Sequence, residues 1–291
     1  MKPAPFEYFD PRTVEEAVSL LREHGEDAKI LAGGQSLMPL LNMRMARPEA
    51  LVDLSRVAGL DYIRETDGAL AIGAMTSKRT VERSELVKSR QPLLHAATLL
   101  VAHPQIRNRG TVGGSMAQAD PAAEYPAVAL VLDAELRAAG PDGERTIKAD
   151  DFFVSYLTTA LEPAEVLTEV RFPMLGDGTG WAFQELSRRH GDFAMAGAAV
   201  TLSVQGAGRC TEARIVLFGV GPVPIRARGA EQMIVGEALG QPLLEAAGRK
   251  ASEDLDEPLS DVHASAEYRR HLAEVLTRRA LNEAMARSGG G

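Results

Sequence analysis

The sequence predicts an α+β protein built from two parts. In the first half, segments with apolar residues at helical spacing alternate with short apolar runs that end at glycines. Near residue 175, the turn-rich stretch MLGDGTG separates this half from a second region that again contains strand-like and helical segments. The length of 291 residues is enough for two or three domains with sizeable cores.

The first elements are a helix and a strand. Thr13 and Glu16 have the spacing of a capping box, and apolar residues follow at helical spacing until Gly25, which predicts a helix that ends near residue 24. The run AKILAGG (28–34) then has the pattern of a buried strand that enters a tight turn at Gly33 and Gly34.

The rest of the first half follows the same alternation. LVDL (51–54) and ALAIGAMT (69–76) predict strands, and SELVKSRQPLLHAATLLVAHP (84–104) contains a mostly apolar helix that should end before Pro104. A second glycine turn lies in residues 106–126, and VALVLDAELRAA (128–139) resumes a strand-like pattern before the turn GPDG.

The second region contains further strands and helices. AVTLSV (199–204) and ARIVLFGV (213–220) predict strands, and apolar residues on one face mark a last helix: Tyr268, Leu272, Val275 and Leu276. We place the domain boundary at the turn-rich stretch, which gives domains of residues 1–175 and 176–291. No fixed-period repeat is visible, which argues against a solenoid.

Composition excludes several classes of function. The formal net charge is −8, from 40 acidic and 32 basic residues without a basic block, so nucleic acid and anionic membrane are poor candidates as partners. One cysteine, Cys210, supplies neither an internal disulfide nor an iron–sulfur cluster, and the six scattered histidines predict no metal site. The N-terminus lacks the apolar core of a signal peptide, and no apolar run approaches the roughly 20 residues that span a bilayer, so we expect a cytoplasmic protein.

Two glycine pairs are candidates for binding an anion. Gly33 and Gly34 follow the run AKILA, and Gly113 and Gly114 lie in TVGGS. Glycine adopts positive φ easily and leaves the backbone amides unobstructed, so successive N–H groups can converge on an anion such as phosphate. Either pair alone could instead be a strand exit that needs only a tight turn.

The flanking residues favour a dinucleotide. Gln35 and Ser36 follow the first pair, and Thr111 and Ser115 bracket the second, so hydroxyls and an amide can complete the hydrogen bonding of a bridging diphosphate. Neither turn has the G-x-G-x-x-G of a Rossmann fold or the G-K-[ST] of a P-loop. A different fold should therefore bind the diphosphate.

Three segments together carry a family resemblance. AKILAGGQSLMPLLNMRMARPEALVDLSR, IRNRGTVGGSMAQADPAAEYPA and SRRHGDFAMAG, in this order and spacing, closely resemble the FAD-binding medium subunit of the molybdenum hydroxylases, the carbon monoxide dehydrogenase and xanthine dehydrogenase family. The resemblance implies a two-part FAD-binding domain of the PCMH or vanillyl-alcohol oxidase type over residues 1–175, with subdomains split near 55–60. A C-terminal α+β domain of the CO dehydrogenase flavoprotein type should follow over residues 176–291.

The resemblance also assigns residues to FAD. The first loop should wrap the diphosphate, the second should contact the flavin side, two carboxylates should accept hydrogen bonds from ribose or ribityl hydroxyls, and an acidic-aromatic pair should lie at the isoalloxazine. The residues are Lys29, Leu31, Ala32, Gly33, Gly34, Gln35 and Ser36; Thr111, Gly113, Gly114 and Ser115; Asp120 and Glu124; Asp192 and Phe193.

Some of these residues have alternative interpretations. Lys29 could be a solvated lysine, Leu31 a core leucine, and Asp120 a helix cap with Pro121 in the first turn. Phe193 could be core instead of stacking on the flavin; some family members have Tyr there, whose hydroxyl Phe193 lacks. Family members often have His where this chain has Gln35, and both side chains can donate a hydrogen bond.

No nucleophile or general base with a partner is visible, which fits electron transfer by a flavin. The resemblance implies an oxidoreductase subunit without catalytic or metal-binding residues of its own. It would take electrons from the [2Fe-2S] clusters of a small subunit and pass them to an external acceptor. A large molybdopterin subunit would oxidise the substrate, in a heterotrimer that dimerises to a heterohexamer.

Several questions stay open at this point. A stand-alone FAD-dependent oxidoreductase of the same fold superfamily, or a non-catalytic nucleotide-binding scaffold, would share the two glycine turns. The substrate could be carbon monoxide, an N-heterocycle, an aldehyde or an aromatic thioester. The acceptor and the flavin potential are not encoded in any motif that we recognise.

Overall fold

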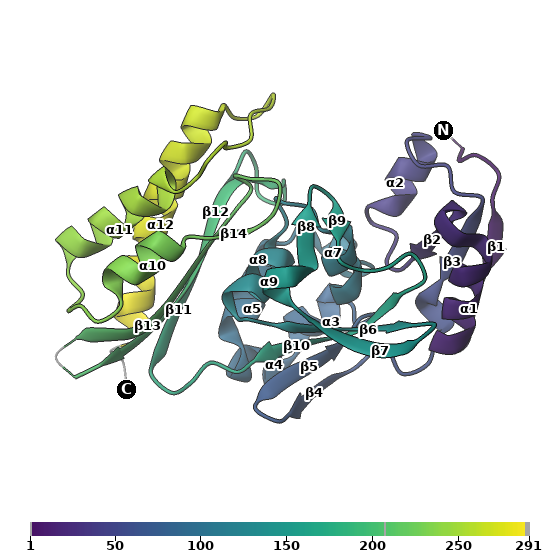
Figure 1. Ribbon diagram of the computed structural model, residues 1–291, viewed down its shortest axis with the longest axis horizontal. Helices are drawn as coiled ribbons and strands as arrows, with labels where there is room; N and C mark the ends of the chain where they lie inside the picture. The colour runs from purple at the N-terminus through teal and green to yellow at the C-terminus, as the bar shows by residue number, and fades with distance from the viewer. Residues whose placement is uncertain (1, 207, 289–291) are drawn as a thin grey trace.

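The computed structural model describes residues 2–206 and 208–288. Its helices and strands form three regions in a row, with the N-terminal sheet at one end of an elongated molecule and the last helices at the other (Figure 1). Each region has its own β-sheet and its own cluster of buried apolar side chains, although the middle cluster extends onto the C-terminal sheet.

The N-terminal region is a small parallel sheet with the strand order β1-β3-β2. Thr13 Oγ1 accepts a hydrogen bond from the Glu16 N–H and caps the first helix, which ends at Gly25 with a φ of 57°. The elements are β1 (Glu7–Phe9), α1 (Val14–His24), the 3-10 turn η1 (Gly25–Asp27), β2 (Ala28–Leu31), α2 (Leu37–Asn42), β3 (Ala50–Asp53) and the 3-10 turn η2 (Leu54–Arg56).

The middle region is an antiparallel sheet with the order β4-β5-β10-β6-β7, and Figure 1 shows helices α5, α7 and α8 on one side of it. Its strands are β4 (Ile63–Thr66), β5 (Ala69–Gly73), β6 (Glu135–Gly140), β7 (Gly143–Lys148) and β10 (Val166–Pro173), with the hairpin β8 (Phe153–Ser155) and β9 (Thr158–Thr159) beside it. Its helices are α3 (Lys78–Arg83), α4 (Glu85–Arg90), α5 (Pro92–Leu100), α6 (Pro104–Arg107), α7 (Val112–Gln118), α8 (Glu124–Val131) and α9 (Ala149–Phe152).

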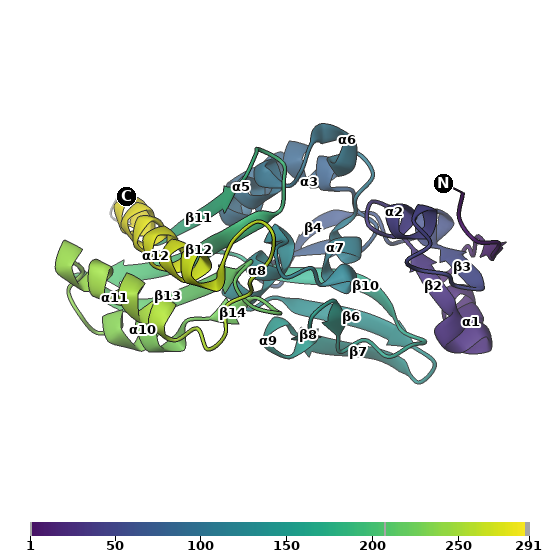
Figure 2. The same cartoon turned by 90° about the horizontal axis from the view of Figure 1, so that it is seen from above.

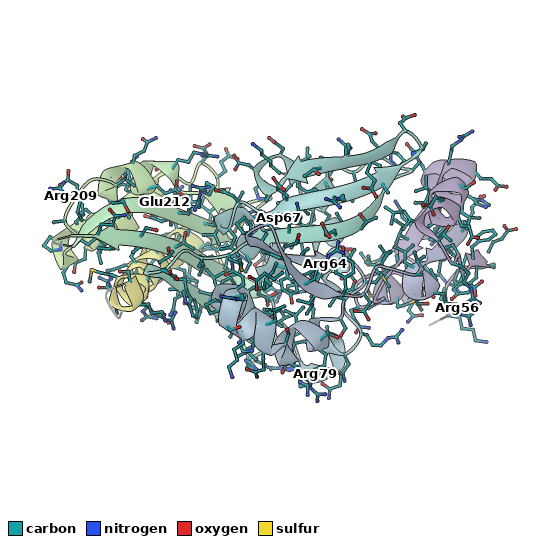
Figure 3. All side chains as sticks on the ribbon, turned by 90° about the horizontal axis from the view of Figure 1, so that it is seen from below. Arg56, Arg64, Asp67, Arg79, Arg209 and Glu212 are labelled. Atoms are coloured by element: carbon teal, nitrogen blue, oxygen red, sulfur yellow. The ribbon has the colours of Figure 1, made fainter. Side chains whose placement is uncertain are left out.

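The opposite face of the middle sheet is polar. Figure 3 shows this face from below, with Arg64 and Asp67 over its strands. The Glu169 carboxylate on β10 is buried among cations and accepts hydrogen bonds from Tyr62 Oη and from Arg64 Nη2. Although burial favours the neutral acid, these hydrogen bonds and the nearby arginines hold the pKa of Glu169 below its usual value.

The C-terminal region is an antiparallel sheet between two layers of helices. Helices α10, α11 and α12 cover one face, and α5 and α8 of the middle region contact the other (Figures 1 and 2). The elements are β11 (Thr179–Ser187), β12 (Ala194–Gln205), β13 (Arg209–Phe218), β14 (Ile225–Arg226), α10 (Arg228–Ile234), α11 (Gln241–Glu253) and α12 (Ala266–Ser288).

The structure confirms most of the predicted elements and corrects three of them. The strand-like run 128–139 is divided: residues 128–131 end helix α8, and only residues 135–140 are a strand. The mostly apolar helix predicted within 84–104 is α5, which begins at Pro92 and ends before Pro104, and the separate helix α4 precedes it. The strand predicted over 69–76 ends at Gly73, and on the last helix Leu272 and Leu276 are buried whereas Tyr268 is exposed.

Candidate functional site

A cavity of about 610 Å³ lies where all three regions meet, between the N-terminal sheet, the helices of the middle region and the loop after β11. This volume is in the range of small-molecule and cofactor sites. Fourteen of the fifteen residues predicted from the sequence line it: Lys29, Ala32, Gly33, Gly34, Gln35, Ser36, Thr111, Gly113, Gly114, Ser115, Asp120, Glu124, Asp192 and Phe193.

The first glycine segment, residues 32–36, connects β2 to α2 and presents free backbone amides. Within the described chain, the N–H groups of Gly33, Gly34, Gln35 and Ser36 have no protein acceptor. Unpaired amides that line a cavity are donors for a ligand, because a backbone N–H that stays unpaired inside a protein is costly. Four successive donors of this kind can surround an anion.

The conformation of this segment depends on its glycines. Gly34 has a φ of 74°, in the left-handed region, and the Gln35 side chain donates to Gly33 O at 3.0 Å. A Cβ at Gly33 would lie 2.1 Å from Arg109 O, so the backbone of the segment touches the chain that leads into the second glycine pair. The glycines therefore bring the two segments together.

The second glycine segment, residues 111–115, uses its amides within the protein. Gly113 N–H donates to Ala74 O at 2.8 Å, Gly114 N–H donates to Thr111 Oγ1 at 3.0 Å, and Ser115 N–H donates to Thr111 O. Gly113 and Gly114 are in the first turn of α7 and have no positive φ, so the turn predicted here is a helix start. At its glycines this segment presents a backbone surface without side chains, which a ligand can approach closely, and its flanking residues carry hydroxyl groups.

Two carboxylates lie on the cavity wall after α7. Asp120 Oδ1 accepts from the Ala122 N–H at 2.9 Å, and helix α8 begins later, at Glu124 with Ala123 as its N-cap. The alternative that Asp120 caps this helix is therefore wrong. Burial raises the pKa of both Asp120 and Glu124 above the ordinary values of carboxyl groups.

The structure adds a residue that sequence reasoning missed. Lys78, at the start of α3, is 8% exposed and lines the cavity. Burial lowers the pKa of its ammonium group, and the nearby Glu124 opposes this shift. The local sequence TSKRT is polar and gave no reason to place a lysine inside the protein.

A loop of the C-terminal region completes the cavity. Gly191, Asp192 and Phe193 lie after β11, and the Phe193 side chain is 62% exposed although it borders the cavity. The interpretation of Phe193 as a core residue is therefore wrong. A Cβ at Gly191 would lie 2.4 Å from the His103 ring, so this loop packs directly on the middle region.

Leu31 is the predicted residue that the structure does not place on the cavity. Its Cδ1 atom lies 3.4 Å from the position of a Cβ at Gly34, so it supports the first glycine segment from behind. Lys29 is exposed, as the solvated interpretation predicted, and it lies at the edge of the same cavity.

The described chain consists of residues 2–206 and 208–288. Within them, no three side chains of His, Cys, Asp or Glu gather in a way that could hold a metal ion. In the same part of the chain, no helix is both long and apolar enough to cross a membrane.

Comparisons with known proteins agree along the whole chain. The family model described as the FAD binding domain in molybdopterin dehydrogenase matches residues 4–175, and the CO dehydrogenase flavoprotein C-terminal domain matches residues 181–284. The chain is 45% identical to the 6-hydroxypseudooxynicotine dehydrogenase complex subunit alpha of Paenarthrobacter nicotinovorans, over 99% of this chain and 97% of that protein. It is 42% identical to the carbon monoxide dehydrogenase medium chain of Hydrogenophaga pseudoflava, over 99% of each chain. A solved structure of carbon monoxide dehydrogenase from that organism superposes with a TM-score of 0.96, at 42% identity and over 99% of each chain.

Proposed function

Since the chain belongs to the family of FAD-binding medium subunits of the molybdenum hydroxylases, we propose that it is the electron-transfer subunit of such a complex. It takes electrons from [2Fe-2S] clusters of a partner subunit and passes them to an external acceptor. The free amides of the first glycine segment, which line a cavity of cofactor size, are the observation that carries this proposal.

The residues on the cavity wall fit FAD. The amides of Gly33, Gly34, Gln35 and Ser36 would hold the diphosphate, which needs several hydrogen-bond donors. Asp120 and Glu124 would accept hydrogen bonds from ribose or ribityl hydroxyls. Ser115 and the wall formed by Gly113 and Gly114 would lie against the flavin side, as the family resemblance implies.

The bound flavin supplies the redox chemistry, because it accepts one or two electrons. The chain's own residues bind it, orient it and limit water access. Phe193, on the C-terminal loop, would cover part of the isoalloxazine. Its ring is largely exposed rather than packed in the core, so it is available to contact a bound cofactor. Asp192 precedes it on the same loop and would approach the flavin from the same side.

The partners would be a large molybdopterin subunit and a small [2Fe-2S] subunit, in a heterotrimer that dimerises to a heterohexamer. Domains of residues 1–175 and 176–291, with the first split near 55–60, are supported by the separation of the three larger sheets. The relatives are named for carbon monoxide and for 6-hydroxypseudooxynicotine at similar identity. The substrate of this complex therefore depends on its molybdenum subunit.

The test is an anaerobic mixing experiment. We expect the purified 291-residue chain to carry FAD and to stay oxidised with substrate, whereas the complex with both partners should bleach the flavin absorbance together with that of the clusters. The control is the same mixture without the cluster subunit. Reduction of the flavin by substrate in the isolated chain would contradict the relay and support a stand-alone oxidoreductase. A chain without flavin would contradict the FAD site itself.

A further inference from the structure

Lys78 is a buried cation with no role in the function described above. It begins α3, and its backbone N–H donates to Gly110 O at 2.8 Å, directly before the second glycine segment. Its side chain lines the cavity and is nearly inaccessible from outside the protein. An ammonium group in such a place is stabilised when a negative group approaches it.

Within the described residues, the ammonium group has no hydrogen bond and no ion pair. Only the Glu124 carboxylate acts on it electrostatically, from beyond ion-pair distance, and Nζ lies 5.2 Å from the centroid of the Tyr125 ring. Glu124 is also buried, lines the same cavity, and has no side-chain partner in the described chain. A lysine amine and a glutamate carboxyl group thus border the same cavity without direct contact between them.

The direction of the side chain indicates which part of a ligand it meets. A Cβ at Gly110 would lie 3.6 Å from Lys78 Cδ and 3.7 Å from Gln35 Cγ, so the stem passes beside the first glycine segment. The tip lies further on, at Tyr125. The ammonium group therefore lies at the part of the cavity next to Tyr125, the chain neighbour of Glu124.

We propose that Lys78 and Glu124 are an opposed pair of charges that tunes the reduction potential of the flavin, with Lys78 raising it and Glu124 lowering it. This inference rests on the FAD site of the proposed function. Two electrons and one proton that enter the isoalloxazine add one negative charge to the ring system. A nearby cation favours that state over the oxidised one, and a nearby carboxylate disfavours it. A buried cation has a larger effect than one in solvent.

The test is a potentiometric titration of the purified full chain with dithionite, followed at flavin wavelengths. Lys78→Met should shift the ratio of oxidised to reduced flavin at a fixed potential at least tenfold toward the oxidised form, which is about 30 mV for a two-electron couple. Lys78→Arg keeps the charge and should stay within threefold of the parent. Glu124→Gln should shift the ratio in the opposite direction. Lys88→Met removes an exposed lysine on α4 and should leave the ratio unchanged.

The FAD content and thermal midpoint of each variant distinguish the possible failures. If Lys78→Met retains FAD and its potential is unchanged, the tuning role is wrong. If it loses FAD and Lys78→Arg restores it, Lys78 binds the diphosphate and the flavin placement is wrong. If Lys78→Met does not fold, Glu124→Gln still tests the proposal. An unchanged flavin potential in that variant would contradict the opposed pair of charges. Absence of FAD from the parent chain contradicts the proposed function instead.

Discussion

Within the described residues, the first glycine segment leaves four backbone amides without a protein acceptor, whereas the second uses the amides of Gly113, Gly114 and Ser115 within the protein. In the first, Gly34 needs a left-handed backbone. In the second, there is no space for a side chain at Gly113, because a Cβ there would lie 2.5 Å from Ala74 Cβ. The same dipeptide thus leaves backbone donors available at a cavity in one place and allows close packing in the other. Substitutions in the first segment should act mainly on FAD, and those in the second mainly on stability.

The largest expected effect is on stability, from Gly113→Ala. The added methyl group would meet Ala74 Cβ at 2.5 Å and the Ala74 backbone oxygen at 2.8 Å, and a helix start packed on a strand end cannot move away easily. We expect a loss of about 2 to 3 kcal/mol in the free energy of unfolding, measured by urea denaturation. Gly176→Ala is the control, since its nearest contact is an ordinary 3.5 Å. Equal stability of the two variants would contradict the conclusion that the second segment is constrained by packing.

Gly34→Ala should affect FAD more than the fold. Its φ of 74° is strained for alanine by about 1 to 2 kcal/mol, and relaxing that strain would turn the free amides away from the diphosphate. Gly59→Ala, at a φ of 79° with nothing near the new methyl group, carries the same backbone strain far from any proposed contact. Isothermal titration of the apoprotein should show weaker FAD binding for Gly34→Ala alone. Similar affinities in both variants would place the diphosphate elsewhere.

Thr111→Ala should cost about 1 kcal/mol of stability, because Thr111 Oγ1 caps α7 by accepting from the Gly114 N–H. Thr111→Ser keeps the oxygen and should recover most of the loss in thermal denaturation. If the serine variant is as unstable as the alanine variant, the cap is not what holds the second segment in place.

The smallest effect on stability is expected from Phe193→Ala, within about 0.5 kcal/mol, because the ring is largely exposed. Removal of the ring from the flavin face should nevertheless change flavin fluorescence and the midpoint potential. The apoprotein and holoprotein forms of both chains are the samples to compare. An unchanged flavin spectrum would show that neither glycine segment delivers the isoalloxazine to this loop.

Local signals predicted the fold well where elements are amphipathic or end at distinctive residues. The Thr13 cap and Gly25 bounded the first helix correctly, and the GPDG turn joins β6 to β7. Helix α8 was misread as a strand because all eight of its residues are buried, which removes the period of 3.6 that distinguishes a helix. Pro92 is visible in the sequence as a helix breaker, but the same residue would be found at a kink or in a short loop. Its position alone therefore does not predict the start of a new helix.

The candidate site depended on family resemblance more than on local pattern. Residues about 80 apart along the chain meet because Gly33 packs on Arg109 O, and no spacing rule predicts such a contact. The FAD-binding medium-subunit family and the α+β fold are confirmed by the matches along the whole chain. Lys78 was missed because a single lysine in a polar stretch carries no sign of burial.

Glu185 lies on β11, the strand that contacts α5, and its Oε2 atom is buried without a hydrogen-bond partner in the described chain. Burial, followed by the charge of Glu124, raises its pKa from 4.5 to about 8. Between these two pH values the folded protein keeps a proton that the unfolded chain has released, so stability declines as the pH rises, by up to about 1.4 kcal/mol per pH unit. Glu185→Gln should abolish that decline in denaturation curves recorded from pH 5 to 8. A proton bound by Glu185 thus stabilises the junction between the middle and C-terminal regions, and its reversible loss at mildly alkaline pH destabilises that junction.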